Sequence, residues 1–258
     1  MSVLQVRDLA RSFGGIRAVD GVSFDLQAGQ MLALIGPNGA GKSTCFDLVN
    51  GQLRPDRGSV RLKGQEITGL APRRIWRLGV GRTFQVAATF GSMSVLHNVQ
   101  MALLSAQRRL YDLWRPLASY DRRQAIVLLE QVGMASQADR PCSQLAYGDL
   151  KRAELAMALA HAPDLLLMDE PTAGMGPAER TRLMGLVRTL ATERRLAVLF
   201  TEHSMPVVFE FADSILVMAR GRLIAQGSAQ QVSADPRVRE LYFGREQQAL
   251  RGGSGPGR

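Results

Sequence analysis

Residues Gly36 to Thr44 read Gly-Pro-Asn-Gly-Ala-Gly-Lys-Ser-Thr. This stretch fills the pattern G-x-x-x-x-G-K-[ST], in which a glycine-rich loop surrounds the phosphates of a nucleotide. The apolar run Met31 to Ile35 before it predicts a buried strand, and Lys42 to Asn50 predicts a helix closed by Gly51. A strand, a glycine-rich loop and a helix in this order predict an α/β fold with a nucleotide site.

The loop suits phosphate for physical reasons. Its successive backbone N–H groups face one concavity, and the helix that follows adds the positive end of its dipole. Glycines let the backbone approach the phosphates without a Cβ clash. Lys42 would reach the β- and γ-phosphates, and the Ser43 hydroxyl would ligate Mg²⁺. The predicted nucleotide-binding residues are Gly36, Pro37, Asn38, Gly39, Ala40, Gly41, Lys42, Ser43 and Thr44.

Two adjacent carboxylates give a second nucleotide signal. The run Leu165 to Met168 reads as a buried strand and ends in Asp169 and Glu170. In ATPases with a phosphate loop, a carboxylate at such a strand end holds Mg²⁺, which is the role predicted for Asp169. Glu170 is one residue further on, where it could polarise the attacking water as general base. Alone, the pair could be a solvated edge; together with the phosphate loop, it predicts catalysis.

Composition limits the size of the core and the classes of protein to which the chain can belong. A chain of 258 residues that is 46% hydrophobic can bury one sizeable core, with a smaller helical lobe. Met1 to Arg7 alternate like an edge strand, without the apolar centre of a signal peptide, and no run approaches the ~18 apolar residues of a membrane span. Only Cys45 and Cys142 occur, which indicates a reducing compartment. The net charge of +9 is compatible with nucleic acid, acidic lipid or nucleotide.

The chain has a simple order of predicted elements. Short strand-like runs dominate residues 1–35, and residues 96–132 show helical spacing and many arginines. The last residues, 251–258, are rich in glycine and proline, as in disordered tails. Two early strands are predicted at Val22–Leu26 and Gly58–Leu62. After the helical stretch, strands and helices alternate as in a wound α/β sheet, with strands predicted at Leu165–Met168, Ala197–Thr201 and Ser214–Met218.

Further motifs make the chain resemble the ATP-binding cassette (ABC) ATPases over nearly its whole length. Leu145-Ala146-Tyr147-Gly148-Asp149 stands where that family has its signature sequence. His203 occupies the place of the switch histidine, and Gln85 matches the glutamine loop between the ATPase core and the helical lobe. Phe13 matches the aromatic residue that stacks on adenine.

The resemblance implies a mechanism that needs two copies of the cassette. ATP would be held between the phosphate loop of one subunit and the signature of the other, so Tyr147 and Gly148 join the nucleotide-binding residues. Glu170, His203 and Gln85 are the implied catalytic residues, and Ser43, Gln85 and Asp169 the implied ligands of Mg²⁺. The cofactors are therefore ATP and Mg²⁺.

The resemblance also implies the domain plan. Residues 1–244 would form a single cassette, a phosphate-loop nucleotide hydrolase of the ABC type, with an antiparallel β subdomain. The helical subdomain would span about 86–160. Residues 245–258 would form a disordered tail.

Within this family, the chain closely resembles one branch, the ATPase subunits of branched-chain amino acid importers. The resemblance is carried by the signature, by Arg82-Thr83-Phe84-Gln85, by Thr201-Glu202-His203-Ser204-Met205 and by the closing Asp235-Pro236-Arg237-Val238 with Tyr242-Phe243-Gly244. Three departures stand out: Ala146 and Tyr147 replace the common serine and glycine, Gly176 replaces an aspartate, and Leu150 replaces a glutamine.

The expected function is ATP hydrolysis that powers a bacterial importer, with the chain peripheral on the cytoplasmic face of the inner membrane. Its expected partners are a second ATPase subunit, in a homo- or heterodimer, transmembrane permeases and indirectly a solute-binding protein. No nucleic acid is expected. The alternatives are a soluble ABC ATPase acting on nucleic acid or the ribosome, and an exporter or lipid-transport ATPase. The basic, aromatic segment Leu104–Arg123 is compatible with a partner-facing surface and with a self-packed helical lobe.

Overall fold

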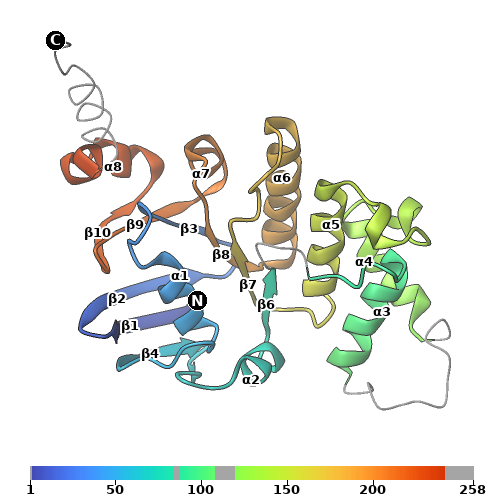
Figure 1. Ribbon diagram of the computed structural model, residues 1–258, viewed down its shortest axis with the longest axis horizontal. Coiled ribbons are helices and arrows are strands. Elements are labelled where there is room, and N and C mark those ends of the chain that lie inside the picture. The colour runs from blue at the N-terminus through green and yellow to red at the C-terminus, as the bar shows by residue number, and fades with distance from the viewer. Residues whose placement is uncertain (1, 84–87, 108–119, 242–258) are drawn as a thin grey trace, which may run out of the picture.

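The computed structural model describes residues 2–83, 88–107 and 120–241 (Figure 1). Its central feature is a six-stranded sheet in the order β10-β9-β3-β8-β7-β6. The strands from β9 to β6 pair in parallel, and β10 pairs antiparallel with β9 at one edge. The bounds are β3 Met31–Ile35, β6 Val80–Thr83, β7 Leu165–Asp169, β8 Ala197–Thr201, β9 Ser214–Ala219 and β10 Arg222–Gly227.

A second sheet is antiparallel and four-stranded, in the order β2-β1-β4-β5. Its strands are β1 Ser2–Phe13, β2 Ile16–Gln27, β4 Arg57–Leu62 and β5 Gln65–Glu66. The prediction that the first residues form an edge strand is wrong, because Leu4 pairs with Leu26 on one side and with Leu62 on the other. Alternation reports which face of a strand is buried, and it carries no information about neighbours along the hydrogen-bonding direction.

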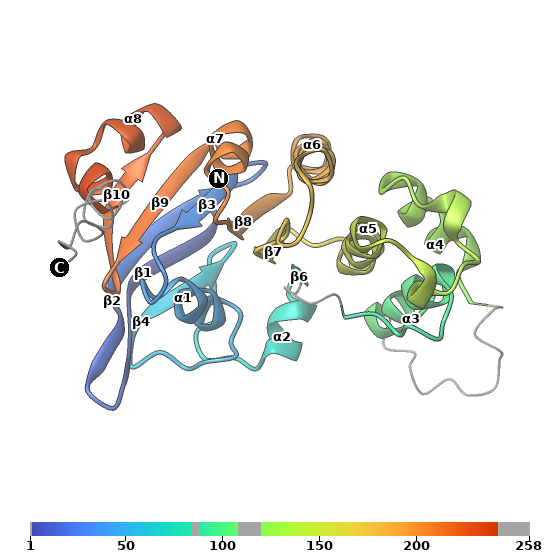
Figure 2. The ribbon, with the colours of Figure 1, turned by 45° about the horizontal axis from the view of Figure 1, so that its top comes forward.

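Three of the helices form a separate group in space. α3, α4 and α5 lie together at one end of the molecule, and the β1–β2 hairpin lies at the other (Figures 1 and 2). None of the helices in the described residues is long and apolar enough to cross a membrane. The α-helices are α1 Lys42–Val49, α2 Pro72–Arg77, α3 Val95–Ala106, α4 Arg122–Gln131, α5 Tyr147–Ala158, α6 Pro177–Arg194, α7 Met205–Phe211 and α8 Ala229–Ala234, and the short 3₁₀ turns are Ala135–Gln137 and Cys142–Gln144.

β3 joins the two halves of the core. All five of its residues are buried, as expected for a strand of a parallel sheet that is covered on both faces. Met31, Ala33 and Ile35 belong to the apolar cluster that extends to helices α3 to α7, whereas Leu32 and Leu34 belong to the cluster that includes the antiparallel sheet and α1. This strand therefore holds the phosphate loop at its carboxyl end on a rigid base, and the predicted α/β class with an antiparallel sheet and a helical part is confirmed.

Part of the Leu104–Arg123 segment lies outside the described residues, including Tyr111 and Trp114. Tyr120 is buried, and its carbonyl accepts a hydrogen bond from Nε2 of Gln100 on α3. This one aromatic side chain of the segment packs inside the protein.

Candidate active site

The phosphate loop approaches two other backbone segments closely. A Cβ atom at Gly41 would lie 2.1 Å from the carbonyl oxygen of Ala18 on β2. A Cβ atom at Gly36 would lie 2.3 Å from the carbonyl oxygen of Met218 on β9. Gly41 also has a φ of +100°, a conformation that L-residues rarely adopt. The fold alone thus requires glycine at these two positions.

Lys42, the first residue of α1, is folded back into the loop. Its Nζ donates hydrogen bonds to the carbonyls of Gly36, at 2.7 Å, and of Pro37, at 3.2 Å. Burial lowers the pKa of Lys42 by desolvating the ammonium, and the charges of Glu170 and Asp169 oppose this shift. The cation is therefore bonded to the loop and interacts electrostatically with the carboxylates of Asp169, the last residue of β7, and of Glu170.

Thr201, the last residue of β8, bonds both acidic residues, the first through its carboxylate and the second through its backbone. The Thr201 hydroxyl donates to Oδ1 of Asp169 at 2.6 Å and accepts the backbone N–H of Glu170 at 3.0 Å. Glu170 has a φ of +46°, so its backbone adopts the left-handed conformation that non-glycine residues take mainly where surroundings enforce it. Its Oε1 lies 2.7 Å from Nε2 of His203. The predicted general base and the predicted switch histidine are therefore in contact.

These pieces face one cavity of about 340 Å³. The cavity brings together the loop, Glu170 and His203. Sequence reasoning missed Ala18, which enters through β2 and carries no local motif that could have revealed it. The lining residues are Ala18, Asn38, Gly39, Ala40, Gly41, Lys42, Ser43, Thr44, Glu170 and His203.

Other predicted site residues are not brought to this cavity. Phe13 is 43% exposed at the end of β1, where the guanidinium of Arg11 lies 5.0 Å from the centre of its ring. Tyr147 and Gly148 begin α5 and are absent from the cavity lining. Gln85 lies outside the described residues.

The start of α5 is an exposed surface of its own. Tyr147 is 40% exposed, and Nζ of Lys151 lies 5.8 Å from the centre of its ring. A Cβ atom at Gly148 would lie 3.4 Å from Oε1 of Glu179 on α6. Oε2 of Glu179 accepts the backbone N–H of Gly176, so the residue that replaces the expected aspartate opens α6 as a capping position.

An ion pair that sequence reasoning missed lies behind the loop. Arg82 on β6 contacts Asp47 on α1, with 3.3 Å between Nη2 and Oδ1. Burial raises the pKa of Asp47, Arg82 lowers it, and the nearby charge of Asp169 raises it again. The pair links α1 to the strand that leads into residues 84–87.

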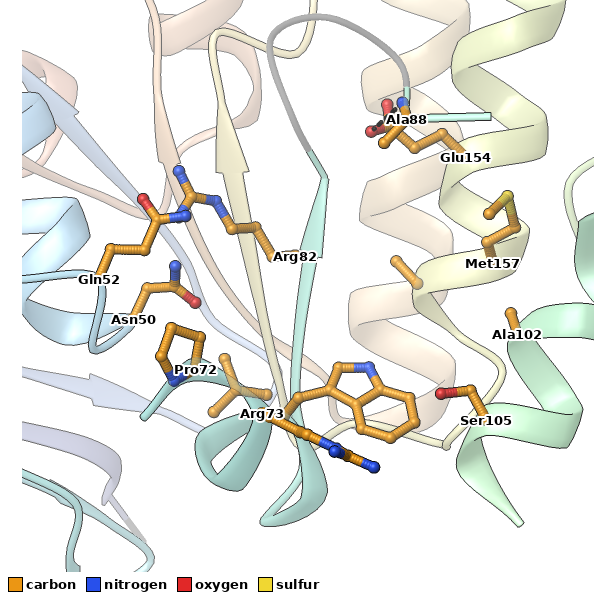
Figure 3. Close-up of a pocket in the computed structure, with 13 residues that line it drawn as sticks. Asn50, Gln52, Pro72, Arg73, Arg82, Ala88, Ala102, Ser105, Glu154 and Met157 are labelled. Atoms are coloured by element: carbon orange, nitrogen blue, oxygen red, sulfur yellow. Dashed lines mark hydrogen bonds between the residues drawn. The ribbon is translucent and has the colours of Figure 1, made fainter. Parts of the chain in front are cut away.

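A larger cavity, of about 460 Å³, lies between α2 and β6 on one side and α3 and α5 on the other (Figure 3). Its lining combines apolar and charged side chains. Trp76 and Met157 are apolar, and the charged residues are Arg73, Arg82 and Glu154. Trp76 also packs against His161, at 4.5 Å between ring centres, and burial lowers the pKa of His161 to about 4. Sequence reasoning did not foresee this cavity, because its walls come from four separate elements.

Comparisons with known proteins agree with this geometry. Residues 19–173 match the family described as ABC transporter, and residues 222–247 match the family described as branched-chain amino acid ATP-binding cassette transporter. The chain is 37% identical over 253 residues to the high-affinity branched-chain amino acid transport ATP-binding protein BraF of Pseudomonas aeruginosa, covering 94% of this chain and 98% of that protein. It is 35% identical over 249 residues to the corresponding LivG protein of Escherichia coli, with the same coverage.

Solved structures share the whole architecture. A nucleotide-free ATP-binding cassette from an ABC transporter superposes with a TM-score of 0.84 at 28% identity, covering 94% of this chain and 99% of that one. A cassette in its ADP conformation gives 0.84 at 29% identity, covering 95% and 99%. The predicted fold type, a phosphate-loop ATPase of the cassette kind, is confirmed. With its phosphate loop, its paired carboxylates and these matches, the chain belongs to the ATP-binding cassette family of ABC transporters.

Proposed function

We propose that this chain hydrolyses ATP to power an importer of branched-chain or related amino acids. The observation that carries the proposal is the 340 Å³ cavity, where a phosphate loop faces a general-base candidate and a histidine. The names of the relatives BraF and LivG support the transported class. The match of residues 222–247 to the branched-chain amino acid transporter family supports it independently of the ATPase core.

The geometry suggests how the chain's own groups act. Gly41 caps α1 without a side chain, so the first N–H groups of this helix are available to phosphate oxygens. Nζ of Lys42, which now donates to the carbonyls of Gly36 and Pro37, would instead donate to the β- and γ-phosphates. Glu170 would then orient and deprotonate the attacking water, and His203, already at hydrogen-bond distance from it, would hold the γ-phosphate.

The donor set also fits Mg²⁺. Ser43 offers a hydroxyl at the cavity wall, and the Asp169 carboxylate is oriented by the Thr201 hydroxyl that bonds its Oδ1. When bound, Mg²⁺ would neutralise the charge that develops on the phosphate oxygens. We include Gln85 as the third predicted ligand.

The separation of the signature from the cavity supports a composite site. Tyr147, which is exposed, and Gly148 lie at the start of α5, outside the cavity of their own chain. A second subunit, identical or related, would bring its signature to this cavity and take this chain's signature in return. Two nucleotides would then be held between two chains, with the adenine of each stacked on Phe13.

The cavity of Figure 3 is our candidate for the permease contact. Its apolar side chains and mixed charges suit a short amphipathic segment, and its lining includes Arg82 and Ala88, which stand on either side of Gln85 in the sequence. A permease bound there would keep the chain on the cytoplasmic face of the membrane, with a solute-binding protein acting from the far side. No role for nucleic acid is part of the proposal.

Uptake in cells tests the function directly. Deletion of the gene should abolish high-affinity uptake of radiolabelled leucine, isoleucine or valine, and a plasmid copy should restore it. A Lys42→Ala copy should not restore uptake. Normal uptake of all three amino acids in the deletion strain would contradict the transported class. Failure of the purified chain to hydrolyse ATP, alone or with its permeases, would contradict the enzymatic part.

A further inference from the structure

Glu202 is a buried carboxylate one residue before His203. It is 4% exposed and lies just after β8. Burying a carboxylate is costly unless hydrogen-bond donors replace its hydration. Within the described part of the chain, its two oxygens accept four hydrogen bonds from three residues, Thr172, His203 and Ser204.

These donors come from two different loops. Oε1 of Glu202 accepts the backbone N–H of Thr172, at 3.1 Å, and also its hydroxyl. Oε2 accepts the backbone N–H groups of His203, at 2.9 Å, and of Ser204, at 3.2 Å. One carboxylate therefore ties the segment after β7 to the loop that carries the histidine.

We infer that Glu202 is a positioning residue for ATP hydrolysis, which sets the place of His203 relative to Glu170. The inference rests on the proposed ATPase activity. Thr201 already fixes the backbone of Glu170, so Thr201 and Glu202 together hold both sides of the 2.7 Å contact between Glu170 and His203. Glu202 itself is absent from the lining of the nucleotide cavity and acts through His203.

Empty space beside His203 would allow its loop to move if the hydrogen bonds to Glu202 were lost. A second cavity, of about 230 Å³, lies against Glu170, Thr172, Glu202 and His203. Displacement of a catalytic group by about 1 Å can cost ~100-fold in rate. Loss of the carboxylate should thus misplace His203 while the phosphate loop, to which Glu202 makes no hydrogen bond within the described residues, stays intact.

Glu202→Gln is a sharp probe of this role. The amide keeps the volume, and its oxygen can still accept from Thr172. Its NH₂ group would then face the N–H groups of His203 and Ser204, donor against donor. We expect kcat to fall about 10- to 100-fold with little change in KM for ATP. Thr172→Val, which removes only the hydroxyl donor, should give a smaller fall in kcat.

The matched control is Glu193→Gln, which removes a carboxylate from the exposed surface of α6 and should leave kcat unchanged.

Hydrogen exchange followed by mass spectrometry should show faster exchange in the peptide containing His203 and Ser204 in Glu202→Gln. Melting temperatures check that both variants fold; if Glu202→Gln does not fold, Thr172→Val carries the test. Wild-type ATPase activity is measured first, so that failure of the proposed function is seen separately.

A double-mutant cycle distinguishes positioning from general destabilisation. Single-turnover assays with enzyme in excess resolve slow rates in the His203→Ala background. If Glu202 acts through His203, adding Glu202→Gln to His203→Ala should change the rate less than twofold. An equal fall in both backgrounds would overturn the inference. So would wild-type kcat in a folded Glu202→Gln or Thr172→Val variant, or a change confined to KM.

Discussion

Nε2 of His203 lies 2.7 Å from Oε1 of Glu170, and the two side chains leave neighbouring parallel strands. The pairing of Asp169 with Thr201 brings the ends of β7 and β8 side by side. Each side chain therefore limits the orientation of the other. The Glu170 side chain is 25% exposed, and the His203 side chain is 49% exposed. A γ-phosphate entering the cavity would meet two groups that are already aligned.

Glu170→Gln should keep nucleotide binding and nearly abolish turnover. The amide preserves the shape and can still contact His203, but it is not a base, and loss of general-base help typically costs ~10²–10⁴-fold in rate. Phosphate release and binding of a fluorescent ATP analogue measure the two properties separately. Glu193→Gln serves as the control, and turnover at the wild-type rate would contradict the assignment.

Lys42→Ala should weaken nucleotide binding as well as turnover. The variant removes the cation nearest the predicted phosphates and also leaves the carbonyls of Gly36 and Pro37 without their donor. Isothermal titration with ATP and EDTA, which blocks turnover, gives the affinity. Lys151→Ala is not a suitable control because it breaks a buried ion pair with Glu154; Lys63→Ala, on the exposed β4–β5 turn, is preferable.

Mixing two defective chains should test the composite site. Gly148→Asp places a carboxylate where the γ-phosphate of the opposite nucleotide is expected, so it should block ATP-driven dimerisation while sparing ATP binding. Gly148→Asn, similar in size but uncharged, should dimerise better than Gly148→Asp. The carboxylate of Glu179 stands beside this position, so melting temperatures of both variants are needed.

In a mixture of Lys42→Ala and Gly148→Asp chains, a heterodimer has one site with both defects and one site with neither. Analytical ultracentrifugation with ATP and EDTA should therefore detect more dimer in the mixture than in either variant alone. Dimerisation of Gly148→Asp alone at the wild-type level would show that the site does not need the partner's signature.

His161 should make the fold less stable in acid. Burial lowers its pKa from 6.5 to about 4, so the native state binds the proton less readily than the unfolded chain. The stabilisation from neutral His161 is complete above pH 6.5 and is lost as the pH falls towards 4. Urea unfolding of wild type and His161→Phe at pH 7 and pH 4.5 should show a smaller acid loss in the variant, which keeps a ring against Trp76. An equal loss in both would contradict this.

The two cysteines should be inert in the native state. Cys45 is buried, and burial raises the pKa of its thiol to about 12; the pKa of Cys142 is raised for the same reason. Because the thiolate is the reactive species, a thiol reagent at pH 8 should modify neither residue until urea unfolds the protein. Rapid modification of Cys45 without denaturant would indicate that α1 opens readily.

Local chemistry was enough to find the phosphate loop and the two acids. Glycine spacing, a lysine and a hydroxyl directly follow an apolar strand, and each of these features lies within a few residues of the next. The same holds for Asp169 and Glu170, which end the run of β7. Strand positions and the α/β class followed from apolar periodicity, which depends only on which side chains must be buried. The family resemblance then named Gly148 and His203.

Only the tertiary structure decided which of these residues meet. Long-range pairing placed β1 inside its sheet, brought Ala18 against Gly41 and set Thr201 beside Asp169. The buried bonds of Glu202 join loops 30 residues apart, so no local pattern could reveal them. The physical reason is that local sequence fixes what a segment can bind and which face it buries, whereas contacts between segments depend on how separate strands and helices share one core.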